Sequence, residues 1–239
     1  MNAHIKVATS AADVARQAAD IIVAAAQRAI AEKGSFSLAL SGGRTPEALY
    51  QLLASEPYRS QIDWSRTELF FGDERCVPPD SPQSNYGMAR RALASAPIPE
   101  ANFHRMRGEI EPEQAAKEYG QLLKQKFGDG GIDLVLLGMG DDGHTASLFP
   151  HTSALDEREH RCVANYVEKL STWRITLTAP FINRSGSVLV LVAGAEKAAR
   201  VHEVLEGAED PHRLPIQMIN PGSGRLIWIL DAGAAGMHD

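Results

Sequence analysis

A histidine in a glycine-rich loop is the first feature of the sequence that could do chemistry. The stretch 138–144, Gly-Met-Gly-Asp-Asp-Gly-His, directly follows an apolar run. A histidine can accept and return a proton at neutral pH, and a nearby carboxylate can fix the tautomer of its ring. Because the chain has no GxSxG nucleophile elbow, we predict that His144 activates a water molecule. The residues alone leave open whether Asp141 or Asp142 contacts His144.

The same loop also matches the GxGxxG pattern of dinucleotide-binding proteins. This match lies deep in the chain, and the two aspartates would face a pyrophosphate. The histidine just past the glycines, and Pro150 soon after it, differ from the usual dinucleotide-binding helix. The pattern therefore favours an acid–base device over a nicotinamide site.

A second glycine-rich loop has the composition of an anion site. Gly42 and Gly43 allow a close approach of the backbone to a ligand, and Ser41 and Thr45 add hydroxyl donors. We predict that Thr45 caps a helix that begins at Pro46, whose free N–H groups would attract a phosphate. An ordinary turn before a helix is the alternative.

Charged residues near other strand ends could complete such a site. Asp73, Glu74 and Arg75 follow one predicted strand, and Arg75 could stabilise negative charge on an oxygen. Arg174 and Lys197 are candidate phosphate ligands. The alternatives are a salt-bridged loop for the first group and solvated surface residues for the other two.

The elements that must position these residues follow from the periodicity of apolar residues. Helices are predicted over 11–32, 46–54, 85–94, 113–127 and 196–205, and strands over 35–40, 68–71, 132–137, 174–178, 187–193 and 226–230. Their alternation predicts an α/β fold with a mostly parallel sheet, in a single domain spanning 1–239. Since ligands bind beyond the carboxyl ends of parallel strands, the loops should meet in one cleft.

Composition limits the classes of partner. The 239 residues carry a net charge of −6, which disfavours nucleic acid but allows a small anion. Cys76 and Cys162 show no metal-binding spacing, and we expect two reduced thiols in a cytoplasmic protein. The apolar stretch 21–30 is too short to span a bilayer, and the first residues lack a signal-peptide core, so no membrane partner is expected.

Three strings resemble the 6-phosphogluconolactonase family: SGGRTPEALY at 41–50, FGDERCVPPDSPQSNYGMAR at 71–90 and LGMGDDGHTASLFP at 137–150. The resemblance implies a doubly wound α/β fold with helices on both faces, shared with glucosamine-6-phosphate deaminases. It implies hydrolysis of 6-phospho-D-glucono-1,5-lactone to 6-phospho-D-gluconate in the oxidative pentose phosphate pathway, without metal or organic cofactor. The partner is then a small sugar-phosphate lactone, and we expect a monomer, although the sequence does not fix the oligomeric state.

The resemblance also implies a role for each candidate residue. His144 would be the general base, Asp142 would orient it, and Arg75 would bind the lactone and its oxyanion. Asp73 would lie near the sugar. The 6-phosphate would be bound by Ser41, Gly42, Gly43, Thr45, Arg174 and Lys197.

Two other functions remain as alternatives. An amino-sugar-phosphate deaminase or isomerase would carry a glutamate where this chain has Phe149, which cannot transfer a proton. A non-catalytic sugar-phosphate sensor attached to DNA would need a helix-turn-helix, and the first 35 residues offer one long helix without a basic patch. The segment 168–173 before Arg174 departs from the proline-rich pattern of the lactonases, so the role of Arg174 depends mainly on the string RITLT.

Overall fold

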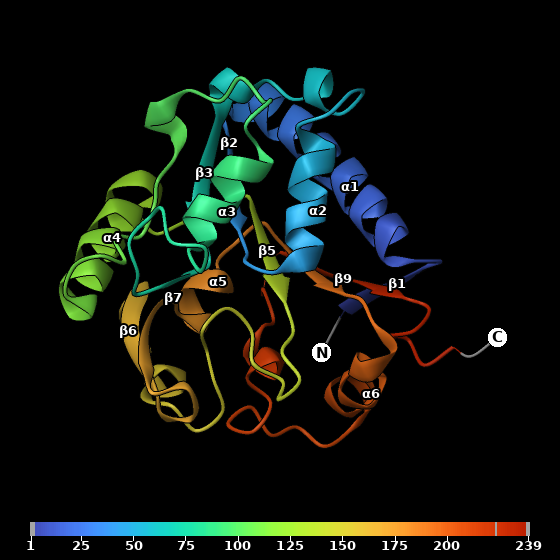
Figure 1. Ribbon diagram of the computed structural model, residues 1–239, viewed down its shortest axis with the longest axis vertical. Helices are drawn as coiled ribbons and strands as arrows, with labels where there is room; N and C mark the ends of the chain where they lie inside the picture. Colours follow the sequence, from blue (N-terminus) through green and yellow to red (C-terminus); the bar gives the residue numbers. More distant parts are fainter. Residues whose placement is uncertain (1–2, 223, 238–239) are drawn as a thin grey trace.

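Six parallel strands form the centre of the computed structural model, which describes residues 3–222 and 224–237 (Figure 1). In spatial order, the strands of this large sheet are β1 (Ala3–Ala8), β9 (Arg225–Asp231), β8 (Ser187–Val192), β5 (Leu134–Gly138), β2 (Phe36–Leu40) and β3 (Thr67–Phe71). Strands β2 and β8 are buried at every residue, as apolar strands covered on both faces must be. The predicted α/β fold with a mostly parallel sheet is confirmed.

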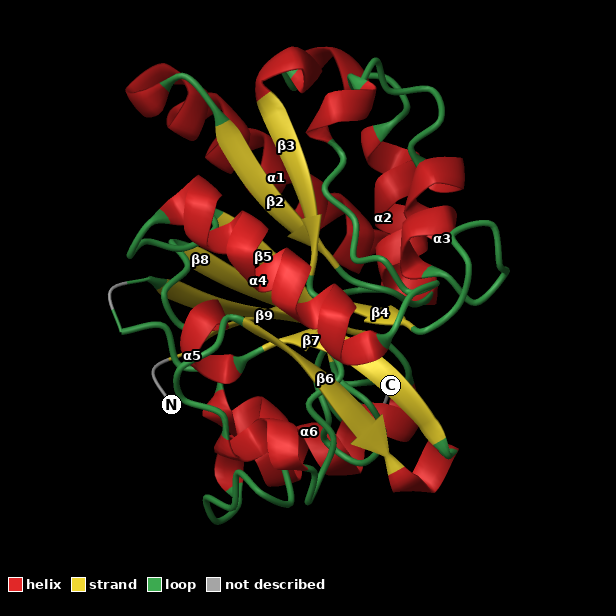
Figure 2. Cartoon of the chain, turned by 90° about the vertical axis from the view of Figure 1, so that its left-hand side faces the viewer, coloured by secondary structure: helices red, strands yellow, loops and turns green. Residues whose placement is uncertain are grey.

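Helices cover both faces of this sheet. They are α1 (Ala11–Lys33), α2 (Arg44–Leu53), α3 (Asn85–Ala92), α4 (Pro112–Phe127), α5 (Ala179–Ile182) and α6 (Ala198–Glu206). Figures 1 and 2 show α4 on one side of the sheet and α1 and α2 on the other. None of the described helices combines the length and the apolar character needed to cross a membrane.

A small antiparallel sheet lies beside the large one, and the sequence did not predict it. Its strands, in spatial order, are β4 (Asp73–Arg75), β7 (Thr172–Leu177) and β6 (Cys162–Val167). The strand predicted over 174–178 therefore exists as β7 but pairs in this second sheet, and β1, β4 and β6 were missed. None of the three is a continuous buried apolar run, and β4 has only three residues.

Gly72 fixes the small sheet to the large one through two backbone hydrogen bonds. Its N–H donates to the carbonyl oxygen of Leu40 at 2.8 Å, and its own carbonyl oxygen accepts from the N–H of Leu177 at 2.8 Å. Strand β3 thus continues through Gly72 into β4, which sets the charged segment at the carboxyl ends of β2 and β3.

The strand order predicts where a ligand binds. Strand β2 pairs with β3 on one side and with β5 on the other. The connections after β2 and β5 therefore leave the sheet in different directions and open a crevice between them. Both glycine-rich loops follow these two strands.

Candidate active site

A cleft of about 430 Å³ lies at this crevice. Among the residues that line it are eight of the ten predicted site residues: Ser41, Gly42, Gly43, Asp73, Arg75, Asp142, His144 and Arg174. Thr45 and Lys197 are not among its lining residues. The fold therefore brings together most of what the sequence singled out.

His144 forms a close pair with a carboxylate in this cleft. Its Nδ1 lies 2.6 Å from Oδ1 of Asp142. The hydrogen bond from His144 holds the pKa of Asp142 well below its usual value, and Lys169, whose Nζ lies 3.1 Å from Oδ2, adds to the shift. A proton on Nδ1, donated to the carboxylate, leaves the lone pair on Nε2. Of the two aspartates left open by the sequence, Asp142 is the one in contact.

Two neighbours fix the imidazole ring. The ring of Phe149 stacks on it with centroids 4.0 Å apart and an angle of 21° between the planes. On another side, a Cβ atom on Gly140 would lie 2.1 Å from both Nδ1 and Cε1 of His144, so this position has room only for a hydrogen. Stacking and close backbone approach therefore restrict the ring to the orientation that pairs with Asp142.

Two arginines lie side by side across the small sheet. The antiparallel register of β4 and β7 pairs Arg75 with Arg174. Like charges directly opposite each other repel, and burial together with the charge of Arg75 lowers the pKa of Arg174. Both side chains line the cleft, so an anion bound there would relieve the repulsion.

Asp73 is held by hydrogen bonds rather than by an arginine. Its Oδ2 accepts from the hydroxyl of Ser147 at 2.6 Å, and its Oδ1 accepts from the amide of Asn85 at 3.2 Å. The amide of Asn85 also donates to the backbone carbonyl of Asp73 at 2.9 Å. These bonds tie the loops after β3 and β5 together at the floor of the cleft.

Glu74 caps a helix, so the salt-bridged alternative for the charged segment does not describe it. The carboxylate accepts from the backbone N–H groups of Asn85 at 2.7 Å, Tyr86 at 2.8 Å and Arg75 at 2.8 Å, and from the hydroxyl of Ser84. Burial raises the pKa of Glu74, and the three N–H donors oppose that shift. Glu74 therefore joins β4 to the start of α3.

Glu74→Ala is expected to lower the free energy of unfolding by about 3 kcal/mol, because it leaves buried N–H groups without an acceptor. Urea unfolding followed by circular dichroism measures the change. Glu159→Ala is the matched control, since Glu159 is exposed. Equal unfolding free energies for the two variants would contradict the capping role.

The glycine-rich loop after β2 begins the helix earlier than predicted. Gly43 has φ 106° and is the N-cap of α2, and its carbonyl accepts from the N–H of Glu47 at 3.0 Å. Thr45 is therefore the second helical residue and not the cap, because the positive φ of Gly43 turns the chain into the helix sooner. The N–H groups of Arg44 and Thr45 belong to the first turn, which lacks intrahelical acceptors.

The rest of this loop is fixed by two contacts. The N–H of Ser41 donates to the hydroxyl of Tyr50 at 2.8 Å, and that hydroxyl donates back to the carbonyl of Ser41 at 2.8 Å. A Cβ atom on Gly42 would lie 2.0 Å from Oδ1 of Asn85. The loop therefore packs directly against the residue that holds Asp73.

A protein-family comparison agrees with this architecture. The family model described as glucosamine-6-phosphate isomerases/6-phosphogluconolactonase matches residues 9–228, which is most of the chain. The chain belongs to this family. The resemblance found in the sequence is thereby confirmed.

Members of the glucosamine-6-phosphate isomerase/6-phosphogluconolactonase family resemble the chain over nearly its whole length. A 6-phosphogluconolactonase from Synechocystis sp. is 45% identical over 214 residues, covering 87% of this chain and 86% of the relative. The structure of a 6-phosphogluconolactonase from Trypanosoma brucei superimposes with a TM-score of 0.87 at 28% identity, over 98% of both chains.

The other branch of the family shares the fold. A monomeric glucosamine-6-phosphate deaminase superimposes with a TM-score of 0.82 at 23% identity, over 98% of this chain and all of that one. In the present chain, Phe149 stacks on His144. The aromatic ring of Phe149 thus helps to fix the orientation of the His144 imidazole.

Lys197 contacts the loop that carries His144, although it does not itself line the cleft. Its Nζ donates to the carbonyl of Met139 at 3.2 Å and forms an ion pair with Asp141, whose pKa it lowers. The lysine thus holds the loop that carries His144 through two residues that line the cleft.

The sequence analysis missed two residues that support the site, Lys169 and Ser147. It named Phe149 and Glu74 but did not predict that Phe149 stacks on His144 or that Glu74 caps α3.

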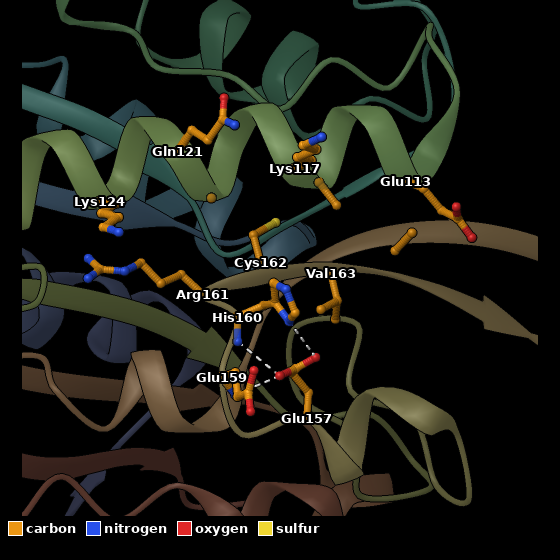
Figure 3. Close-up of a pocket in the computed structure, with 13 residues that line it drawn as sticks. Glu113, Lys117, Gln121, Lys124, Glu157, Glu159, His160, Arg161, Cys162 and Val163 are labelled. Atoms are coloured by element: carbon orange, nitrogen blue, oxygen red, sulfur yellow. Dashed lines mark hydrogen bonds and ion pairs between the residues drawn. The ribbon is translucent and has the colours of Figure 1, made fainter.

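A larger cavity, of about 710 Å³, lies away from this site between α4 and β6 (Figure 3). His160 contacts Glu157 there, with Nδ1 3.0 Å from Oε2. Burial raises the pKa of Cys162, so its thiol stays protonated. None of the predicted site residues lines this cavity.

Within residues 3–222 and 224–237, no group of three or more His, Cys, Asp or Glu could hold a metal ion.

Proposed function

We propose that the cleft binds 6-phospho-D-glucono-1,5-lactone and hydrolyses it to 6-phospho-D-gluconate with His144 as the general base. The hydrolysis itself is supported by relatives named 6-phosphogluconolactonase, at 45% and 41% identity over 87% and 90% of the chain. The observation that carries the assignment of the base is the 2.6 Å contact between His144 and Asp142, in a cleft that Arg75 and Arg174 also line.

The proposed reaction begins with a water molecule next to Nε2 of His144. The imidazole takes one proton as the water oxygen bonds to the lactone carbonyl carbon, and the carbonyl electron pair moves onto its oxygen. The ring C–O bond then breaks as the carbonyl re-forms, and the imidazolium proton goes to the departing ring oxygen. Asp142 stabilises the imidazolium, and Arg75 stabilises the oxyanion.

The 6-phosphate is proposed to lie against Arg174 and the start of α2. Arg174 offers a planar guanidinium, and the start of α2 offers the N–H groups of Arg44 and Thr45 and a partial positive charge. Ser41, Gly42 and Gly43 would line the phosphate, and Asp73 would accept a sugar hydroxyl. No step of this mechanism uses a metal or an organic cofactor.

A lactonase assay tests the proposal. Freshly generated 6-phosphogluconolactone is added to the protein, and the spontaneous rate of ring opening is subtracted. We expect catalysed opening of the lactone and no release of ammonia from glucosamine 6-phosphate. Ammonia release without lactone hydrolysis would overturn the proposal in favour of the deaminase alternative.

Arg174→Ala and Lys197→Ala are expected to raise KM roughly tenfold with little change in kcat, because remote phosphate contacts hold substrate and transition state alike. For Lys197 this requires that its Nζ leave the ion pair with Asp141 and contact the substrate phosphate instead. Steady-state kinetics measures both constants, with the exposed Arg184→Ala as control. A fall in kcat at unchanged KM for Lys197→Ala would instead show that this lysine supports the loop of His144.

We further propose that residues 1–239 act as one catalytic domain, as a cytoplasmic monomer. Free thiols at Cys76 and Cys162 support a reducing compartment. Gel filtration combined with light scattering tests the monomer.

A further inference from the structure

A pocket of about 340 Å³ lies between α1 and the large sheet, at the end opposite to the cleft. Leu134, Ser187 and Arg225 line it, and they are the first residues of β5, β8 and β9. The cleft loops, in contrast, follow the last residues of β2 and β5. The two sites are therefore separated by the length of the parallel strands, and they share no lining residue.

Four basic side chains surround this pocket. They are His4 and Lys6 on β1, Arg28 on α1 and Arg225 on β9. No acidic residue is among the described residues that line it. Such a cluster stands out on a chain with a net charge of −6.

These basic groups also lack partners. Within the part of the chain that the structure describes, none of the four forms an ion pair. Other cations on the same helix do: Arg16 and Lys33 each lie 2.6 Å from a carboxylate oxygen. The four basic residues are exposed to solvent, and no carboxylate of the described residues compensates their charge.

The register of the sheet explains how the cluster forms. Parallel pairing sets His4 beside Ile227 and Arg225 beside Ser187, and residues two apart on a strand point to the same face. Figure 1 shows β1 and β9 next to each other on the side of the molecule that carries α1. One face of the sheet edge thus presents basic side chains from both strands toward the helix.

The floor of the pocket is apolar. Ile21, Ala25 and Arg28 recur at helical spacing on α1, and the small side chains of Ala24 and Ala25 leave room above Ile227. A ligand that fills the pocket would therefore contact apolar surface with one part and basic groups with another. The volume lies at the lower end of the range of about 300–1,000 Å³ typical of small-molecule sites.

We propose that this pocket binds a small organic phosphate with at least two negative charges and an apolar portion. The phosphates would contact Arg28, Arg225, Lys6 and His4, where charge-assisted hydrogen bonds are strong. The apolar portion would cover Ile21 and Ile227. Inorganic polyphosphate has the charge without the apolar part, so it should bind more weakly than a nucleotide of the same charge.

Isothermal titration calorimetry on the full chain tests the site, with adenosine 5′-triphosphate and inorganic triphosphate as probes. We expect adenosine 5′-triphosphate to bind more tightly, and Arg28→Gln/Arg225→Gln to weaken it about tenfold or more. Arg91→Gln/Arg184→Gln removes the same charge from two positions that are equally exposed but lie outside the pocket, and should leave the affinity unchanged. Arg174→Ala should also retain the affinity for adenosine 5′-triphosphate, because Arg174 lines the cleft and not this pocket.

Three outcomes would overturn the proposal. The first is an affinity for adenosine 5′-triphosphate that is the same in wild type and Arg28→Gln/Arg225→Gln. The second is an equal loss in the Arg91→Gln/Arg184→Gln control, which would indicate unspecific charge attraction. The third is binding to vesicles of equal parts phosphatidylcholine and phosphatidylglycerol without binding of the free nucleotide, which would assign the surface to a lipid headgroup. Lactone hydrolysis by Arg28→Gln/Arg225→Gln should stay at the wild-type rate in every case.

Discussion

His144→Ala is expected to lower kcat for lactone hydrolysis by about 10³-fold, the range contributed by a well-placed general base. The variant loses the Nε2 that would take the proton of the attacking water, while the arginines and the start of α2 remain. Binding of 6-phospho-D-gluconate should therefore persist. Stopped-flow hydrolysis of freshly made lactone and calorimetric titration with the product measure the two quantities.

His160→Ala is the matched control for this variant. Its imidazole also contacts a carboxylate, that of Glu157 at 3.0 Å, but in the cavity between α4 and β6. Its kcat should stay at the wild-type value. Near-normal turnover by His144→Ala would remove this histidine from the role of base, and a loss of product binding would place it among the phosphate contacts instead.

The pairing with Asp142 bears on how activity should depend on pH. The hydrogen bond from His144 keeps the pKa of Asp142 well below that of an ordinary carboxyl, so Asp142 remains ionised throughout the range in which imidazoles titrate. Loss of activity on acidification is therefore not expected to report protonation of Asp142.

The sequence predicted the loops of the cleft better than it predicted the sheet that carries the arginines. Gly-rich segments after buried parallel strands have a strong local signal, and the loops of Ser41–Gly43 and His144 are where it indicated. The pairing of Arg75 with Arg174 depends on the register of two antiparallel strands far apart in the chain. No local pattern encodes such a register.

The supporting residues were missed for a related reason. Glu74 was grouped with its charged neighbours, yet its carboxylate caps α3 because the chain bends at Gly72 and carries it to the helix. Lys169 reaches Asp142 from the connection between β6 and β7, and β6 itself was not predicted. Charge in a sequence shows what a residue can bind, while the tertiary fold decides its partner.

Gly140→Ala is expected to reduce kcat about 10²-fold in a protein that still folds, because misplacing a catalytic group by about 1 Å costs this much. The added Cβ would lie 2.1 Å from Nδ1 and Cε1 of His144, so the ring must move. Any such movement lengthens the 2.6 Å contact with Asp142 or disturbs the stacking on Phe149. Steady-state kinetics measures the loss, and thermal unfolding confirms that the variant folds.

Gly120→Ala separates this effect from that of adding a methyl group to any glycine. Gly120 lies within α4, and a Cβ there meets no atom within 4 Å. Alanine favours a helix over glycine by about 0.5–1 kcal/mol, so this control should gain stability and keep full kcat. If Gly140→Ala also kept full kcat, the orientation of the imidazole would not limit turnover. Free imidazole gives a further distinction between the two variants. It should restore activity to His144→Ala, where it can occupy the space left by the ring. It should not restore activity to Gly140→Ala, where the displaced ring of His144 is still present.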